Sequence, residues 1–179
     1  MPIKIYVAGK ICSGKSTLAK EIASFTGYQV ISFGTIIKEY LVQNGQPVTR
    51  EILQSAGQEL INQFGYDGFL RWSIEHSSKS RWNSSLIVDG LRHAGIYRCL
   101  LDMFPLSLLV YCDCSPTTQL KRIITRDHIS ANEAQGILCH ETEQHISELN
   151  PLANLCFQAE DSIETFLLRL DKLIKLHQT

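Results

Sequence analysis

Short apolar runs alternate along the chain with longer segments in which apolar residues recur at helical spacing. The short runs are rich in β-branched residues and predict buried strands at residues 3–8, 29–32, 85–89, 106–112 and 155–158. Strands that are separated by helices favour a parallel sheet covered on both faces. We therefore expect an α/β fold, a three-layer α/β/α sandwich with five parallel strands.

The segments between these strands carry helix start and stop signals. The predicted helices cover residues 14–25, 35–44, 49–64, 68–76, 94–103 and 116–127. Ser130 and Glu133 have the spacing of a capping box, as do Asp161 and Glu164, so further helices are expected to begin at Ser130 and Asp161. The polar stretch 77–83 is predicted to be a loop.

The length of 179 residues suits one α/β domain. Because the sequence shows no repeat, low-complexity segment or linker, residues 1–179 are expected to form a single domain. The helical stretch 34–77 is expected to lie as an insertion over the functional edge of the sheet. Residues 117–149 are expected to form a second flap at the same edge.

The charge is balanced, with 17 Lys and Arg against 18 Asp and Glu. A nonspecific nucleic-acid binder usually carries a basic excess, so no nucleic acid polymer is expected as a partner. The one local basic cluster consists of Lys121, Arg122 and Arg126. Such a cluster suits a small, highly charged ligand better than a polymer.

No stretch approaches the roughly 20 apolar residues that cross a bilayer, so no membrane partner is expected. The first residues lead into a predicted strand without a signal-peptide pattern, which favours a cytoplasmic protein. Six cysteines occur without a zinc-binding or redox spacing, and Cys112 and Cys114 are the only close pair. We expect reduced thiols that pack as small apolar side chains.

The turn after the first predicted strand carries a complete phosphate-binding motif. Residues 9–16 fit G-x-x-x-x-G-K-[ST] between a buried strand and an amphipathic helix. Such a loop turns its amides toward an anion, and the helix adds its positive end. Lys15 is expected to reach the β- and γ-phosphates of ATP, and Ser16 to ligate Mg²⁺. The expected nucleotide-binding residues are Gly9, Lys10, Ile11, Cys12, Ser13, Gly14, Lys15, Ser16 and Thr17.

The alternative interpretation of this loop is a glycine turn without a ligand. A second signal favours the nucleotide. The strand 85–89 ends in Asp89, followed by Gly90. In P-loop proteins an acid on a neighbouring strand orients Mg²⁺, so Ser16 and Asp89 are the expected metal residues. The alternative for Asp89 is an ordinary Asp-Gly turn.

The motif alone does not separate kinases, GTPases and ATP-driven machines. The chain lacks the Asn-Lys-x-Asp motif that recognises guanine, which argues against a GTPase. It is also short for a remodelling ATPase with an additional helical domain. A kinase for a small acceptor remains, since further cationic residues are available for a second phosphorylated ligand.

Three segments carry a family resemblance. The adenylate-kinase segment that lines the acceptor site is similar to Ser32-Phe-Gly-Thr-Ile-Ile-Lys38, and that family's Asp-Gly-Phe-Pro-Arg is similar to Asp89-Gly-Leu-Arg92-His93. The arginine-bearing lid of the family resembles the stretch with Arg122 and Arg126. The sequence thus resembles the P-loop nucleoside monophosphate kinase superfamily, which includes adenylate kinases and dephospho-CoA kinases.

The resemblance implies roles for these residues. Residues 34–77 would be the acceptor-binding insertion and residues 117–149 the lid. The implied acceptor-binding residues are Ser32, Gly34, Lys38 and Arg92. The implied catalytic residues are Lys15, Arg92, Arg122 and Arg126. Small-molecule nucleotides would be the substrates, with ATP and Mg²⁺ as cofactors.

The sequence also departs from that family. Ile96 stands where adenylate kinases have the glutamine that recognises adenine, Lys38 replaces an arginine, and the segment with Arg92 is one residue shorter. A lysine binds phosphate as a point charge without the bidentate geometry of arginine. The acceptor base is therefore open. His93 and His128 flank these segments, and each has a structural alternative to a ligand contact.

Three functional hypotheses follow from these residues. The first is a kinase that phosphorylates a nucleoside monophosphate. The second is a kinase with a hydroxyl acceptor, as in dephospho-CoA kinases. The third is a nucleotide-dependent binding module without turnover. The preference for ATP over GTP rests on the missing guanine motif, and the sequence gives no indication of the oligomeric state.

Overall fold

Five parallel strands form the centre of the molecule. The computed structural model describes residues 2–138 and 145–178. Its strands are β1 (Lys4–Gly9), β2 (Gln29–Ser32), β3 (Leu86–Leu91), β4 (Ser107–Asp113) and β5 (Leu155–Gln158). They pair in the order β2-β3-β1-β4-β5, and every pairing is parallel. The predicted five-stranded parallel sheet is confirmed.

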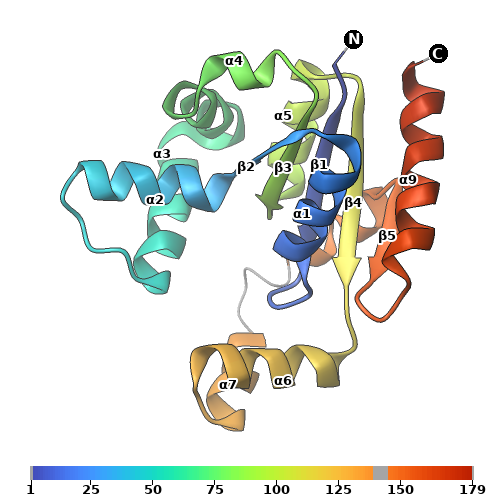
Figure 1. Cartoon of the computed structure of the whole chain (residues 1–179). Coiled ribbons are helices and arrows are strands. Elements are labelled where there is room, and N and C mark those ends of the chain that lie inside the picture. The colour runs from blue at the N-terminus through green and yellow to red at the C-terminus, as the bar shows by residue number, and fades with distance from the viewer. Residues whose placement is uncertain (1, 139–144, 179) are drawn as a thin grey trace.

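Helices connect the strands and cover the sheet (Figure 1). They are α1 (Lys15–Thr26), α2 (Phe33–Gln43), α3 (Arg50–His76), α4 (Lys79–Trp82), α5 (Ala94–Met103), α6 (Pro116–Asp127), α7 (Ala131–Leu138), the 3-10 turn η1 (Asn150–Leu152) and α9 (Ile163–Gln178). No helix in the described ranges is long and apolar enough to cross a membrane.

The alternation of side chains along β1 explains the three layers. Ile5 and Val7 pack with α1 and α9 in one buried cluster. Tyr6 and Ala8 pack on the other face, with residues of α2, α3 and α5. Successive side chains of a strand point to opposite faces, so a strand that is apolar throughout needs cover on both sides. The predicted α/β/α architecture is confirmed.

All strands of a parallel sheet present their carboxyl ends at the same edge. This edge lies at the bottom of Figure 1, where α6 and α7 lie beneath it, while α2 and α3 project to one side. The two ends of the chain lie at the opposite edge. Ligands of open parallel sheets bind at the carboxyl edge, so this edge is where the predicted site residues have to meet.

One helix prediction is confirmed and one is wrong. The break predicted at Gly65, between helices 49–64 and 68–76, lies inside α3 (Arg50–His76) as a kink at Gly65, whose φ of 70° is not helical. Glycine adopts this left-handed value without a steric penalty, so the chain bends there and the helix resumes. The stretch 77–83 was expected to be a loop, but it contains the single turn α4, whose Trp82 is buried.

The two predicted capping boxes have different outcomes. Ser130 and Glu133 cap each other: the Ser130 amide donates to the Glu133 carboxylate over 2.8 Å, and the Glu133 amide donates to Ser130 Oγ over 3.3 Å. The prediction at Asp161 is wrong by one residue. Ser162 Oγ accepts from the Thr165 amide, while the Asp161 carboxylate accepts from the Gln158 amide.

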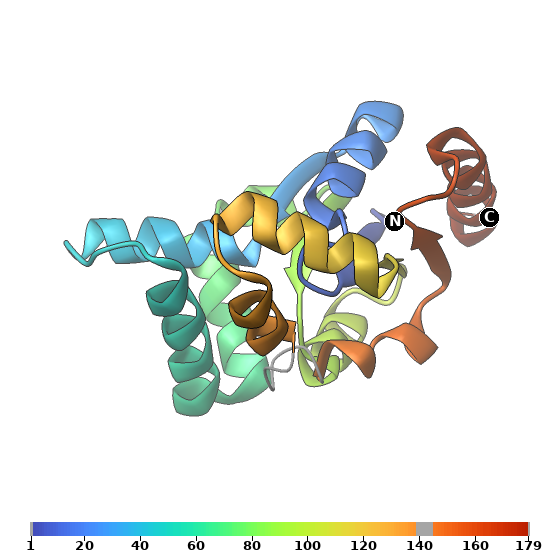
Figure 2. The same ribbon diagram turned by 90° about the horizontal axis from the view of Figure 1, so that it is seen from below.

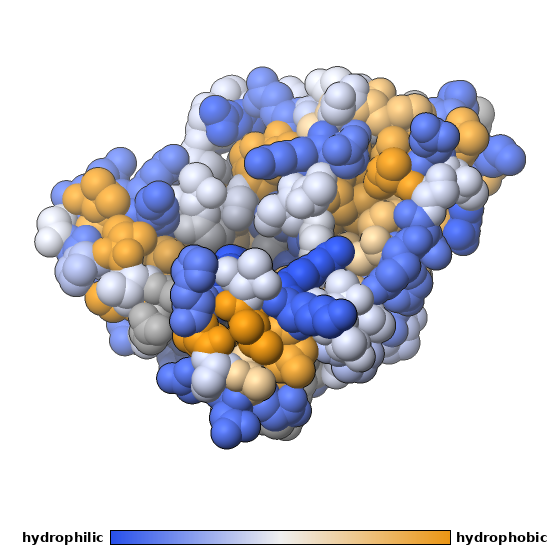
Figure 3. All heavy atoms as spheres, turned by 60° about the horizontal axis from the view of Figure 1, so that its bottom comes forward, coloured by the Kyte–Doolittle hydropathy of each residue, from blue (hydrophilic) through white to orange (hydrophobic). Residues whose placement is uncertain are grey.

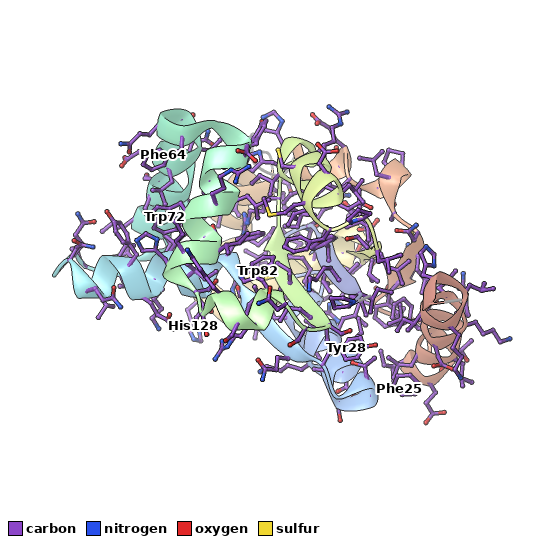
Figure 4. The ribbon with its side chains drawn as sticks, turned by 90° about the horizontal axis from the view of Figure 1, so that it is seen from above. Phe25, Tyr28, Phe64, Trp72, Trp82 and His128 are labelled. Carbon is purple, nitrogen blue, oxygen red and sulfur yellow. The ribbon has the colours of Figure 1, made fainter. Side chains whose placement is uncertain are left out.

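A buried lysine lies at the amino end of β1. The Lys4 side chain has no exposed surface, and its Nζ donates to the carbonyl oxygen of Trp82 over 2.7 Å and to that of Ser84. The ammonium also lies 5.0 Å from the centre of the Phe104 ring. Lys4 thus connects α4 to the sheet at the edge opposite the predicted site. Figure 4 views the molecule from this side and labels Trp82.

Candidate functional site

The loop between β1 and α1 packs directly against β4. Gly9 has a φ of 144°, and a Cβ atom at this position would lie 2.0 Å from the carbonyl oxygen of Cys112. No side chain fits into that space, so the glycine of the motif is a packing requirement as well as a conformational one. Gly14 caps α1 with a φ of 101°.

The carbonyls of this loop accept hydrogen bonds from one side chain of the motif and from two side chains of α6. Lys15 Nζ donates to the Lys10 carbonyl over 2.5 Å, and Arg122 Nη1 donates to the Cys12 carbonyl over 3.2 Å. Gln119 Nε2 donates to the Ile11 carbonyl over 2.8 Å. The loop is therefore held from outside by donors that its own sequence motif does not include.

Ser16 and Asp89 meet at the adjacent ends of α1 and β3. Ser16 Oγ donates to Asp89 Oδ2 over 2.8 Å. Asp89 is 8% exposed, and its Oδ1 has no hydrogen-bond partner among the described residues. A buried carboxylate oxygen without a partner is costly unless a cation or water binds it. Hydroxyl and carboxylate oxygens are the donors that Mg²⁺ prefers, so this pair fits the expected metal.

A cavity of about 1310 Å³ opens in front of the loop. Figure 3 shows the hollow, with hydrophilic side chains reaching over it above the lobe formed by α6 and α7. The expected site residues that line it are Ile11, Cys12, Ser13, Gly14, Lys15, Ser16, Thr17, Ser32, Gly34, Asp89, Arg92, Arg122 and Arg126. Segments far apart in the sequence thus share one cavity. Gly9, Lys10 and Lys38 are not among its lining residues.

The two lid arginines have different partners. Arg122 lies over the loop, with its Nη1 3.6 Å from where a Cβ atom of Gly14 would be. Arg126 is half-exposed and makes two hydrogen bonds of 2.7 Å with its neighbour Asp127. This ion pair raises the pKa of Arg126. Arg122 is thus directed at the loop, whereas Arg126 has to leave Asp127 before it can bind a ligand.

On the acceptor side, Ser32 and Arg92 line the cavity, but Lys38 is exposed on α2. His93 has a structural environment. Its ring is half-buried and lies 5.8 Å from the ring of Tyr66 and 5.9 Å from that of His145. Burial lowers the pKa of His93, and the nearby His145 and Arg92 lower it further. His128 is exposed at the end of α6 and does not line the cavity.

Sequence reasoning missed several residues of this site. Gln119 carried no signal in the sequence, because its bond to the loop spans 108 positions. Lys121 was named only as part of the basic cluster and not as a site residue, but it lines the cavity. Residues in and after β5 do so as well: Phe157, Ala159 and Asp161. A signal for these was present, because β5 ends at the same edge as the other strands.

A glycine loop between a parallel strand and a helix, with Lys15, Ser16 and a carboxylate on the adjacent strand, defines a P-loop nucleotide-binding protein. The family described as AAA domain matches residues 5–143 of this chain. A cytidylate kinase of Thermoplasma volcanium is 30% identical over 146 residues, which cover 82% of this chain and 70% of the relative. A dephospho-CoA kinase of Hydrogenovibrio crunogenus is 24% identical and covers 98% of this chain and 99% of the relative.

Solved structures agree on the fold. A shikimate kinase of Bacteroides thetaiotaomicron has a TM-score of 0.58 at 18% identity, covering 97% of this chain and 98% of that one. A sugar kinase of Janibacter has a TM-score of 0.60 at 17% identity, covering 98% and 95%. The chain belongs to the AAA domain family of P-loop proteins, and its similarity to kinases of small molecules is consistent with ATP-dependent phosphoryl transfer to a small acceptor.

Proposed function

We propose that the protein is a Mg-ATP-dependent kinase whose acceptor is a nucleoside monophosphate or a similar small phosphorylated molecule. One observation carries this proposal: the P-loop with its Ser16–Asp89 pair and three arginines, Arg92, Arg122 and Arg126, line the same cavity. A triphosphate alone does not require cationic groups on two further sides. A second phosphorylated ligand explains them, since transfer between two anions needs charge neutralisation.

The loop and Lys15 hold the phosphates of ATP in this proposal. Lys15 now donates to a carbonyl of its own loop, and a phosphate oxygen is a better acceptor because it is charged. Ser16 and Asp89 would hold Mg²⁺. When bound, the metal neutralises charge on the phosphates. The remaining groups of the loop position the nucleotide, and Arg122 binds the phosphoryl group that is transferred.

Arg92 and Ser32 bind the acceptor's phosphate. Both line the cavity on the side of β2 and β3, opposite α6. Lys38 joins them only if α2 moves, because it is now exposed and outside the cavity lining. Residues 34–77 act as the acceptor-binding insertion and residues 117–149 as the lid of a single domain. Closure of both excludes water, which would otherwise accept the phosphoryl group.

A hydroxyl acceptor is the second candidate. The dephospho-CoA kinase relative covers nearly the whole chain and favours it. Such a reaction needs a base for the hydroxyl proton. Asp89 already binds Ser16, and its second oxygen fits the metal. A phosphate acceptor needs no base, so the engagement of Asp89 by Ser16 favours the first candidate. A binding module without turnover is the third possibility.

The test is ADP release with Mg-ATP over a panel of nucleoside monophosphates, beginning with CMP, and with dephospho-CoA. We expect slow hydrolysis without an acceptor and a rate at least about 100-fold higher with the true one, because correct positioning supplies most of the rate. Arg92→Ala should lower kcat/KM for the acceptor, whereas Arg98→Ala, an exposed arginine on α5 outside the cavity, should not. Vigorous hydrolysis that no acceptor changes would contradict the proposal.

The proposed substrates place the protein in the cytoplasm, where ATP and Mg²⁺ are abundant. The thiols fit this location. Cys99, Cys112, Cys114 and Cys156 are free thiols. Burial raises the pKa of Cys112 to about 11, so that its thiol stays protonated and unreactive at neutral pH.

A further inference from the structure

One face of α6 lies against the phosphate loop. Gln119, Arg122 and Arg126 recur at spacings of three and four residues and therefore share that face. The first two each donate to a carbonyl of the loop. Viewed from below, α6 crosses the carboxyl edge beside the turn that leads into α1 (Figure 2). The helix and the loop are thus joined by contacts from two successive turns of α6.

Gln119 is the buried member of this face. It is 4% exposed, whereas Arg122 is exposed. Ile11, whose carbonyl Gln119 binds, and Ile123, one turn further along α6, are buried together in a small apolar cluster. An apolar side chain would fill such a place at lower cost if packing were the only requirement. The bond of 2.8 Å from Gln119 Nε2 to the Ile11 carbonyl satisfies the amide and fixes that carbonyl.

Fixing the Ile11 carbonyl also fixes the next amide. The peptide between Ile11 and Cys12 is planar and trans, as no cis peptide bond occurs in the described residues. Its C=O and its N–H therefore point in opposite directions. A carbonyl held toward Gln119 turns the Cys12 N–H away from that side chain. Arg122 acts in the same way on the following peptide, through the Cys12 carbonyl.

The backbone of the loop is strained in this conformation. Cys12 has a φ of 55°, a left-handed value that is unfavourable for a residue with a side chain. A strained backbone persists only when surrounding contacts hold it in place. Two side chains of α6 provide such contacts at Cys12, because Gln119 binds the carbonyl before it and Arg122 binds its own carbonyl.

We propose that Gln119 is a positioning residue that presets the amides of the phosphate loop for a triphosphate and couples the lid helix α6 to the loop. The proposal rests on the proposed function in one respect: the ligand of the loop is ATP. If the proposal holds, the amides of the loop already have their ATP-binding orientation before ATP binds. Loss of the donor should weaken ATP binding with little effect on the chemical step, because Gln119 does not touch the reacting atoms.

The test compares Gln119→Met, which keeps the length and removes the donor, with Asn154→Leu as control. Asn154 also makes one side chain to main chain bond between elements, of 2.7 Å to the Leu109 amide, but outside the cavity. We expect KM and Kd for ATP to rise about 10-fold in Gln119→Met with kcat within a factor of two, the pattern of lost ground-state binding. Asn154→Leu should leave both constants unchanged.

Gln119→Glu separates positioning from simple packing. A carboxylate cannot donate to the Ile11 carbonyl, but the protonated acid can. Relative to the wild type at the same pH, the ATP affinity of Gln119→Glu should therefore recover as the pH falls through the pKa of the acid. That of Gln119→Met should stay low at every pH. A parallel pH response of the two variants would overturn the positioning role.

Hydrogen exchange without nucleotide keeps this test independent of the proposed function. Amides of residues 11–14 should exchange several-fold faster in Gln119→Met than in the wild type or in Asn154→Leu. Equal exchange in all three proteins, with equal ATP affinity, would overturn the role of Gln119 and leave the kinase assignment standing. A wild type that binds no triphosphate would refute the proposed function, while the exchange data would still decide about Gln119.

Discussion

Two lysines at opposite ends of β1 perform different tasks with the same chemical group. Lys4, at the amino end, has no exposed surface and binds two carbonyls of a neighbouring segment. Lys15, just beyond the carboxyl end, lines the cavity and binds one carbonyl of its own loop. Lys4 makes no ion pair with a carboxylate in the described part of the chain.

The difference lies in what could replace the carbonyls. Lys4 has no exposed surface, so no ligand can replace its carbonyl partners and its side chain serves the fold alone. The partner of Lys15 is only five residues away and borders open space, so a phosphate can take its place. Main-chain carbonyls thus serve one lysine as permanent ligands and the other as a temporary one. Four predictions test this contrast.

The largest effect is expected for Lys15→Met. Loss of a charge-assisted bond to phosphate should weaken ATP binding by at least about 100-fold, measured by calorimetry. The melting temperature without nucleotide should stay within about 2 °C, because the bond from Lys15 to the Lys10 carbonyl spans only five residues of the same loop. A large fall in melting temperature would show that Lys15 supports the fold as Lys4 does.

The reverse is expected for Lys4→Met. The carbonyls of Trp82 and Ser84 lose their donor inside the protein, which should lower the free energy of unfolding by about 2 kcal/mol. Urea unfolding measures this change. The Kd for ATP should stay as in the wild type, since Lys4 lies at the far edge of the sheet. A stability equal to that of the wild type would mean that β1 tolerates an apolar residue there.

Asp89→Asn tests the metal side of the comparison. An amide keeps a bond to Ser16 but loses the charge that attracts Mg²⁺, so Mg²⁺ should improve ATP binding about 10-fold less than in the wild type. The measurement is ATP affinity in Mg²⁺ and in EDTA. In EDTA the two proteins should bind alike or the variant more tightly, because a negative charge near the phosphates has been removed. An unchanged Mg²⁺ dependence would exclude Asp89 from the metal site.

The smallest effect is a pH dependence. Burial lowers the pKa of Lys4 to about 8, below its unfolded value of 10.5. Between these values the unfolded chain binds more protons, so this group makes the free energy of unfolding rise with pH, by at most about 1.4 kcal/mol per unit. The difference in stability between wild type and Lys4→Met should therefore grow from pH 8 to pH 10. Taking the difference removes the opposite effect of Tyr6 and Tyr97, whose pKa values burial raises.

The parts of the molecule that the sequence predicted well are encoded locally. The phosphate loop is eight consecutive residues, and the strands are short apolar runs whose pattern needs no partner to be visible. The helices α5 and α6 have the predicted bounds, because a Pro or a change of polarity marks their ends. Lys4 lies inside such an apolar run, yet nothing adjacent to it indicates the carbonyls that surround it.

Features that depend on distant partners were missed. The bond of Gln119 to the loop joins positions 108 apart, and the burial of Trp82 depends on how α4 meets the sheet. The break at Gly65 is a contrasting case, because the glycine signals it locally and helices were predicted on both sides of it. The roles of Lys38 and Arg126 remain predictions, and that of Arg92 is a prediction that the kinetics of Arg92→Ala test.

The contact between Gly9 and Cys112 has a mechanical consequence. The end of β1 packs against the end of β4, with no room for even a methyl group between Gly9 and the Cys112 carbonyl. β4 ends at Asp113, and α6 begins only three residues later at Pro116. The amino end of α6 is therefore held close to the phosphate loop. Any swing of α6 has to take place at Cys114 and Ser115, a hinge only two residues long.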